Sequence, residues 1–149
     1  MLEKELKFIE DSIQFKDRKN LKVSKATVGW HLDHSLKVLN SVLFAIKNSD
    51  PKLYKKKFNS LRFITFTLGK FPRGKAKSPK RVLPPEIIET VAIKNQLEEV
   101  KSNLKFMDEL DENHFFEHPY FNHLNKKQTI KFFGMHTNHH LKIIKDILK

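Results

Sequence analysis

The stretch from residue 125 to residue 149, NKKQTIKFFGMHTNHHLKIIKDILK, decides the fold, because it predicts one long amphipathic helix. Asn125 and Gln128 have the spacing of a capping box, in which two side chains close the first turn of a helix. Apolar residues then recur every three or four positions, and lysines occupy the opposite face. His136 and His140 are one turn apart on the apolar face, so both imidazoles are expected to point into the protein.

The same helical periodicity predicts an all-α fold for the rest of the chain. Helices are expected over residues 2–16, from Ser24 or Thr27 to Lys47, from Asp50 to Gly69, from Pro85 to Leu110, and over residues 125–149. Residues 69–85 are rich in Gly and Pro and predict a long crossover, and residues 111–125 are expected to form an aromatic-rich loop. Together these elements predict a single domain over residues 1–149. Its expected architecture is a four-helix bundle with a long crossover between its second and third helices, plus a short N-terminal helix.

Composition limits the class of protein. The chain has 149 residues, the size of one domain, and no Cys, which excludes disulfides, thiolate catalysis and Cys-ligated zinc. The charged N-terminus lacks the apolar region of a secretory signal, and no apolar run approaches the roughly 18 residues of a membrane span. We therefore expect a cytoplasmic protein with no membrane partner.

One segment supplies nearly all of the formal charge of +12. Residues 51–85 contain eleven Lys and Arg and no Asp or Glu, which leaves +1 (12 − 11) for the rest of the chain. Such a segment is either a solvated surface or a binding site for an anion. The candidate anion-binding residues are the cations of the predicted crossover: Arg73, Lys75, Lys77 and Lys80.

Eight His in a chain without Cys are its most informative feature. Two imidazoles four residues apart on one helix face can bind a single metal ion, which makes His136 and His140 candidate ligands. A third ligand is expected from the second helix, where His31 lies inside the apolar stripe and His34 lies at its edge. Periodicity slightly favours His31 as the buried residue, and both remain candidates.

Further polar residues near these positions have other expected roles. His139 lies at the edge of the last helix's apolar stripe, and Asp33 lies between the two histidines of the second helix. With His31 they are candidates for supporting the ligands or for a general base, but no residue is identified as catalytic. A structural His cluster is the alternative, because an inward His is more often a hydrogen-bonded core residue than a ligand.

Two familiar metal chemistries are excluded by spacing. The chain has no Glu-x-x-His, the motif that di-iron helical bundles use in pairs. The run from His136 to His140, HTNHH, has no Glu after its first His and therefore lacks the general base of a zincin peptidase.

Three stretches of the chain resemble motifs of a known family: residues 26–34 (ATVGWHLDH), 71–80 (FPRGKAKSPK) and 132–140 (FFGMHTNHH). They are similar, in order, to the entry into the second helix, the crossover loop and the final His-x-x-His-His motif of the DinB/YfiT-like superfamily of metal-dependent enzymes. More specifically, they resemble one of its uncharacterised branches. The resemblance spans most of the chain, and the C-terminal motif is its most specific part.

The resemblance implies a four-helix bundle, often a homodimer, with one divalent ion, zinc or nickel, held by three histidines. Alignment of the Thr-Val-Gly run implies these ligands: His34, His136 and His140. Ala26 stands where the family usually has Trp, and Trp30 comes four residues later, so His31 stays an alternative to His34. The family also implies a transferase or hydrolase, with a low-molecular-weight thiol as a further cofactor. The cations from Arg73 to Lys80 add the expectation of a small anionic substrate.

The competing hypothesis is a basic, non-catalytic module that binds nucleic acid or another polyanion through residues 51–85. Single-stranded nucleic acid is usually held by cations interleaved with stacking aromatic side chains. The aromatic interleaving here is thin, with Phe66 and Phe71 as its examples, so nucleic acid is the less favoured partner.

Overall fold

The computed structural model describes residues 1–71 and 79–149, which are mostly helical, as predicted. Its α-helices are α1 (Glu3–Ser12), α2 (Val28–Lys47), α3 (Ser60–Leu68), α4 (Thr90–Asn103) and α5 (Lys126–Leu148). Two short strands, β1 (Phe115–His118) and β2 (Asn122–Asn125), form an antiparallel hairpin before α5. Short 3-10 turns complete it: η1 (Ile13–Phe15), η2 (Pro51–Leu53), η3 (Lys80–Val82) and η4 (Leu104–Glu109). Within the described ranges, no helix is long and apolar enough to cross a membrane.

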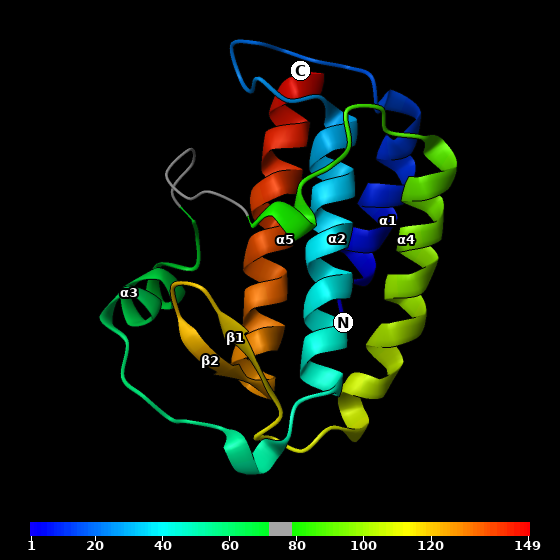
Figure 1. Ribbon diagram of the computed structural model, residues 1–149. Coiled ribbons are helices and arrows are strands. Elements are labelled where there is room, and N and C mark those ends of the chain that lie inside the picture. The colour runs from blue at the N-terminus through cyan, green and yellow to red at the C-terminus, as the bar shows by residue number, and fades with distance from the viewer. Residues whose placement is uncertain (72–78) are drawn as a thin grey trace.

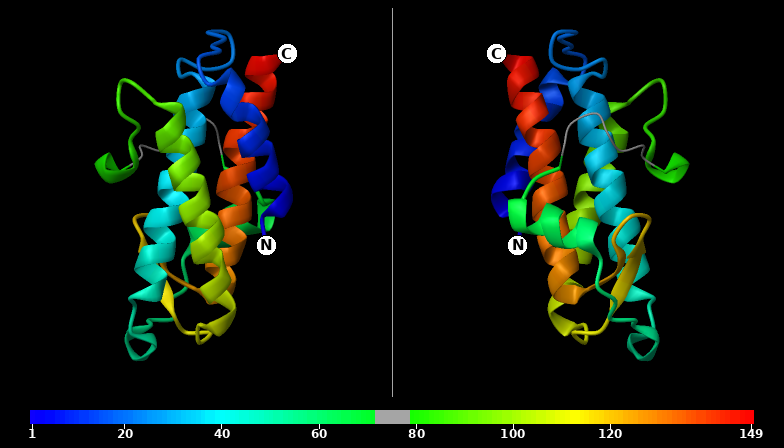
Figure 2. Two further views of the ribbon diagram at one scale, coloured as in Figure 1. Left: turned by 90° about the vertical axis from the view of Figure 1, so that its right-hand side faces the viewer. Right: turned by 90° about the vertical axis from the view of Figure 1, so that its left-hand side faces the viewer.

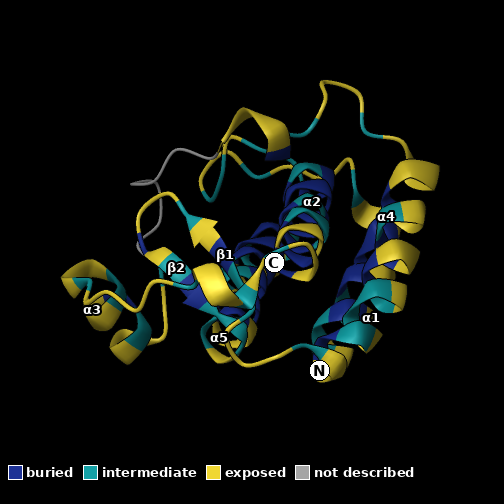
Figure 3. Ribbon diagram, turned by 60° about the horizontal axis from the view of Figure 1, so that its bottom comes forward, coloured by how far each residue is buried: buried dark blue, intermediate teal, exposed yellow. Residues whose placement is uncertain are grey.

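Helices α1, α2, α4 and α5 run side by side, whereas α3 lies outside them (Figure 1). In the right-hand view of Figure 2, in which the left-hand side of Figure 1 faces the viewer, α3 lies in front of α5. Buried residues lie along the long helices and are drawn in dark blue in Figure 3. Ile9, Leu36, Ile93 and Phe133, one from each of these helices, are almost completely buried. Removing such apolar surface from water is the main favourable term in folding.

Local interactions fix the starts of the two helices that carry the candidate ligands. The side chain of Thr27 caps α2, and Asn125 and Gln128 form the predicted capping box at the start of α5. Gly29 allows a close approach between the chain ahead of α2 and its first turn. A Cβ at this position would lie 2.9 Å from the carbonyl oxygen of Lys16, which accepts the Gly29 N–H at 2.7 Å.

The predicted helix over residues 50–69 is wrong in its first half. The chain forms the short turn η2, then lacks helix as far as Asn59, and becomes helical in α3. The Asn59 side chain accepts the backbone N–H of Arg62, which caps a new helix at this point. The apolar spacing that suggested one long helix therefore spans two separate segments.

The prediction of a four-helix bundle also assigned the wrong helices to the bundle. Phe58 and Leu68, two apolar residues within the helix predicted from Asp50 to Gly69, are 80% and 62% exposed. The N-terminal helix, expected to be an addition, instead packs against α4 and α5 and has its Leu6 and Ile9 side chains buried. Burial against two helices thus makes α1 part of the core, and α3 is the addition.

The predicted loop over residues 111–125 contains the hairpin, so the fold is not all-α. Its register pairs Phe116 with Leu124 and Glu117 with His123. Because side chains alternate along a strand and paired residues share a face, His118 lies on the face of Phe116, opposite His123. Phe116 and Leu124 are buried, and the hairpin packs against α2 and α5.

The fourth predicted helix is shorter than expected. Helix α4 begins at Thr90 rather than at Pro85, and it ends at Asn103, after which the chain continues as η4. The crossover between α3 and α4 returns to the long helices through η3. Its residues 72–78 lie outside the described part of the chain.

Candidate metal centre

Three histidines from two helices converge between α2 and α5. His34 lies on α2, and His136 and His140 lie one turn apart on α5. One ring nitrogen from each residue lies within 4.8 Å of the other two. Nitrogen ligands about 2.0–2.1 Å from a shared zinc ion lie roughly 3.4 Å apart, so the three nitrogens are grouped somewhat more loosely than in a formed zinc site.

A backbone carbonyl fixes the tautomer of His34. Its Nδ1 lies 2.8 Å from the carbonyl oxygen of Val82, and because a carbonyl only accepts, Nδ1 donates and carries the proton. Nε2 then keeps its lone pair for a metal ion. The Trp30 ring stacks on the His34 ring, with the two ring centroids 5.0 Å apart. The crossover residue Val82 thus orients a ligand on α2.

His31 supports His140 in a comparable way. The Nδ1 atoms of the two rings lie 3.0 Å apart, and Nε2 of His31 lies 3.1 Å from Oγ of Ser24. Since Nδ1 of His140 is engaged, Nε2 is the atom left to bind a metal, and Nδ1 then donates to His31. His31 in turn donates through Nε2 to the serine oxygen. His31 therefore contacts His140 directly, while the converging group comprises His34, His136 and His140.

His136 presents a polar atom that needs a partner. Its Nδ1 is buried and has no hydrogen-bond partner among the described residues. Leaving a buried polar atom unsatisfied typically costs about 1–3 kcal/mol. The ring stacks on Phe132, with centroids 5.5 Å apart, which fixes its plane. A bound ion is one way to engage a ring held in this position.

Burial lowers the pKa of all three histidines. For His34, burial outweighs the hydrogen bond to Val82, which acts to raise its pKa. The pKa values of His136 and His140 lie well below the ordinary imidazole value, first because of burial and then because of the neighbouring histidines. Neutral imidazoles keep the lone pairs that metal binding requires, so burial prepares these rings as ligands near neutral pH.

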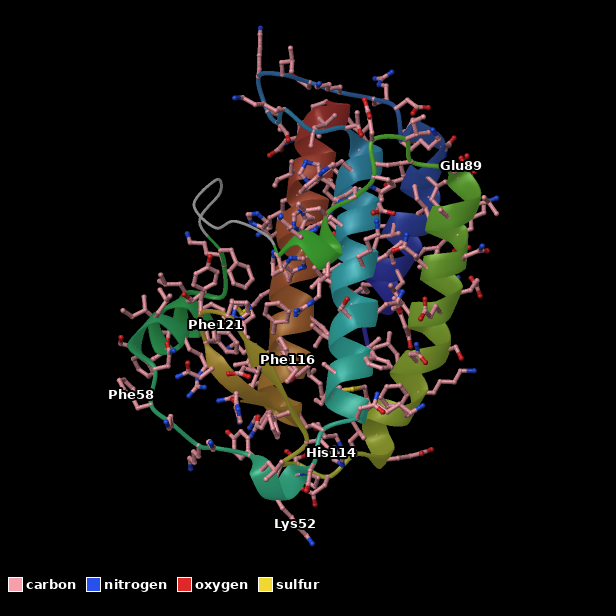
Figure 4. The ribbon with its side chains drawn as sticks, in the orientation of Figure 1. Lys52, Phe58, Glu89, His114, Phe116 and Phe121 are labelled. Carbon is pink, nitrogen blue, oxygen red and sulfur yellow. The ribbon has the colours of Figure 1, made fainter. Side chains whose placement is uncertain are left out.

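The group lines a cavity of about 860 Å³. Aromatic rings from several elements form its walls: Trp30, Phe71, Phe116, Tyr120, Phe121 and Phe132. Phe116 and Phe121 lie on the hairpin beside α5, whereas Phe58 lies at the outer edge of the molecule (Figure 4). The cavity is therefore an apolar space with a histidine cluster in its wall.

Other residues predicted for the site lie in different places. His139 lines the cavity, but it does not belong to the converging group. Asp33 pairs with Lys37 at 2.7 Å and accepts a hydrogen bond from Gln96 at 2.7 Å. It thereby ties α2 to α4, and although it does not line the cavity, its negative charge acts to raise the pKa of the neighbouring His34.

Of the predicted anion-binding residues, the structure describes Lys80. Arg73, Lys75 and Lys77 lie outside the described residues, and Lys80 is exposed and does not line the cavity. Its neighbour Arg81 does, because the 3-10 turn η3 directs consecutive side chains differently. The basic composition of residues 51–85 indicated positive charge near the site, but it did not identify Arg81 as the residue that supplies it.

His118 was missed as a residue of the cavity. Its Nδ1 accepts the backbone N–H of Tyr120 at 3.1 Å, and its ring stacks on Phe121 with centroids 4.3 Å apart. Burial lowers its pKa to about 4, so it is neutral near pH 7 and carries its proton on Nε2. The alternation of Phe116, Glu117 and His118 was the available indication of a strand, but four residues are too few to show a clear period.

Comparison of the chain with protein-family models, with curated proteins and with solved structures finds no match. The functional interpretation of the cavity therefore depends on its own geometry and residue chemistry.

Proposed function

We propose that this protein is a divalent-metal-dependent enzyme, a transferase or hydrolase of the DinB/YfiT-like kind that its sequence resembles, acting on a small anionic substrate. One observation carries the proposal: ring nitrogens of His34, His136 and His140 converge within 4.8 Å in the wall of a large cavity. Three neutral nitrogen ligands suit zinc or nickel. A bound ion of this type supplies Lewis-acid chemistry, polarising a substrate or lowering the pKa of a water or thiol attached to it.

The chain's own residues orient the ligands and shape the space around them. Val82 holds the ring of His34, and His31 holds that of His140. The aromatic walls exclude water from an apolar substrate surface, and Arg81 offers a positive charge to an anionic one. His118 presents a neutral ring to the same cavity, where it is suited to donate a hydrogen bond through Nε2.

Metal content is the test of this proposal. Protein purified without a His tag should contain about one zinc or nickel ion per chain by elemental analysis. A His34→Ala/His136→Ala/His140→Ala variant should contain none, while a His114→Ala/His123→Ala variant should keep the ion. Circular dichroism must show that both variants are folded. Equal metal content in the two variants would contradict the proposed site.

Activity assays should follow on the metal-loaded protein. A panel of hydrolase and group-transfer substrates, each tested with and without a low-molecular-weight thiol, separates the two reaction types. Dependence on added thiol would identify a transferase that uses it as a cofactor. Turnover that survives complete removal of the metal would contradict a metal-dependent reaction.

A polyanion-binding function is the second candidate, because the segment before α3 presents free cations. Lys52, Lys55, Lys56 and Lys57 are exposed, and their side chains form no ion pair with the described residues. Arg62 is not available, since its guanidinium donates to the carbonyls of Lys57, Phe121 and His123. This function predicts duplex affinity that falls steeply with salt and is unaffected by chelators.

A further inference from the structure

The walls of the cavity are too apolar for a ligand that is only a small ion. Aromatic rings contact one another along its length, including Phe116 with Phe132 at 5.4 Å and Phe71 with Phe121 at 6.2 Å between centroids. Val38, Val42 and Ile143 add aliphatic surface. A volume of about 860 Å³ lies in the range of sites that enclose whole organic molecules.

The charged side chains that the described residues present to this cavity all have the same sign. Among the described residues that line it, Lys25 and Arg81 are cationic and none is Asp or Glu. Both are exposed, and neither side chain forms a hydrogen bond or ion pair with another described residue. Unpaired cations beside an apolar space attract an anionic group more strongly than cations in open water do.

The two cations lie close to the histidine end of the cavity. Lys25 follows Ser24, whose hydroxyl contacts His31 at 3.1 Å. Arg81 precedes Val82, whose carbonyl contacts His34 at 2.8 Å. The hairpin lies further along the same side of α2 and α5, away from η3 (Figure 1). The cavity is therefore polarised along its length, with the two cations and the converging histidines at one end and the hairpin's aromatic residues and His118 at the other.

We propose that this cavity binds an amphipathic organic anion: a flat, aromatic or similarly apolar body carrying one carboxylate, sulfonate or phosphate group. The anionic group lies at Lys25 and Arg81, beside the histidines, and the apolar body extends toward Phe116 and Phe121. This assignment concerns the same cavity as the proposed enzyme and names its class of substrate. A small inorganic ion leaves the aromatic walls unused, and a neutral apolar molecule leaves both cations without a partner.

A matched pair of fluorescent probes tests this assignment. 1-Anilinonaphthalene-8-sulfonate carries an aromatic body and one anionic group, and N-phenyl-1-naphthylamine has the same ring system without the sulfonate. Trp30 is the chain's one tryptophan and lines the cavity, so energy transfer from it to the probe reports binding there. The measurement is made on the full chain, both metal-free and loaded with zinc.

The anion should bind saturably and more tightly than the neutral probe. A Lys25→Gln/Arg81→Gln variant should lose about tenfold in affinity for the sulfonate, the equivalent of one modest charge interaction, and little for the neutral probe. The control variant Lys52→Gln/Lys56→Gln, which removes two exposed cations that do not line the cavity, should change neither. A Phe58→Ser/Phe63→Ser variant, which removes exposed aromatic rings near α3, should leave energy transfer from Trp30 intact.

Three results would overturn the assignment: no saturable energy transfer from Trp30, equal losses for both probes in the Lys25/Arg81 variant, or loss of binding in the Phe58/Phe63 variant. Selective binding of the sulfonate by the metal-free protein supports it independently of the metal. If elemental analysis finds no metal but the sulfonate still binds as described, the proposed enzyme fails and the anion site stands. If metal is bound but the protein binds the two probes equally tightly, the anion site fails and the proposed enzyme stands.

Discussion

Two groups of three histidines each lie in very different surroundings in this molecule. We call them the helix histidines (His34, His136 and His140) and the hairpin histidines (His114, His118 and His123). Ring nitrogens of the helix histidines lie within 4.8 Å of one another. Each hairpin histidine instead has its Nδ1 engaged by a separate group: the Ser49 hydroxyl, the Tyr120 N–H and the Lys55 N–H, respectively.

Secondary structure explains the difference. A four-residue spacing within α5 places His136 and His140 on one face, and the neighbouring α2 adds His34. In the hairpin, alternation places His118 and His123 on opposite faces, where they stack on Phe121 and Phe115. A high content of histidine therefore does not make a metal site; convergence from packed helices does.

The largest expected effect comes from removing one helix histidine. His140→Ala should weaken zinc binding at least about 100-fold, because losing a direct ligand should exceed the 10–100-fold cost of losing a residue that supports one. Competition with a chelator of known affinity measures the change. His123→Ala should leave the affinity unaltered, and an equal loss in both variants would remove the distinction between the two groups.

A smaller loss is expected at the residue behind the ligands. His31→Phe keeps an aromatic ring but removes the hydrogen bond that links Nδ1 of His31 to Nδ1 of His140 at 3.0 Å. We expect roughly a tenfold weaker affinity for zinc with the stoichiometry unchanged. The same chelator competition measures it. Complete loss of the ion would mean that His31 is itself a ligand, and an unchanged affinity would mean that it does not orient His140.

His118, on the hairpin, should make the free energy of unfolding depend on pH. Burial lowers the pKa of His118 from 6.5 to about 4 in the folded protein. Between these values the unfolded chain binds a proton that the folded protein does not, so stability falls as the pH is lowered through this window. For this partly exposed ring we expect a contribution of about 1–2 kcal/mol.

Urea unfolding of metal-free protein between pH 4 and pH 7 measures this contribution. His118→Phe should flatten the dependence relative to the unaltered chain, since the replacement cannot take up a proton. His123→Phe, on the opposite face of the hairpin, is the control and should leave the dependence as it is. A slope that is the same in all three proteins would show that the burial of His118 does not affect its protonation.

Much of the fold could be predicted where a helix is long and capped. The capping box at Asn125 and Gln128 and the cap at Thr27 set the starts of α5 and α2, and both were visible in the sequence. The segment over residues 50–69 could not be placed in the same way, because helical spacing does not show whether a face is covered by another element. Only packing reveals that Leu68 is exposed and that Ile9 is buried.

The same difference separates the residues of the site that could be predicted from those that could not. The i, i+4 spacing of His136 and His140 was readable because both lie on one helix. Arg81 and Val82 reach the site from a crossover, and nothing in their local sequence indicates a contact with α2. The choice between His31 and His34 was open for the same reason: the groups that distinguish them, Ser24 and Val82, come from segments outside the helix.

The most direct test of the account is to locate the metal itself. Crystals of this chain grown with zinc should give one strong anomalous-scattering peak between α2 and α5. The peak should lie about 2.0–2.1 Å from one nitrogen of each helix histidine. A peak bound by the hairpin histidines instead, or no peak at all beside His34, His136 and His140 in zinc-saturated crystals, would contradict it.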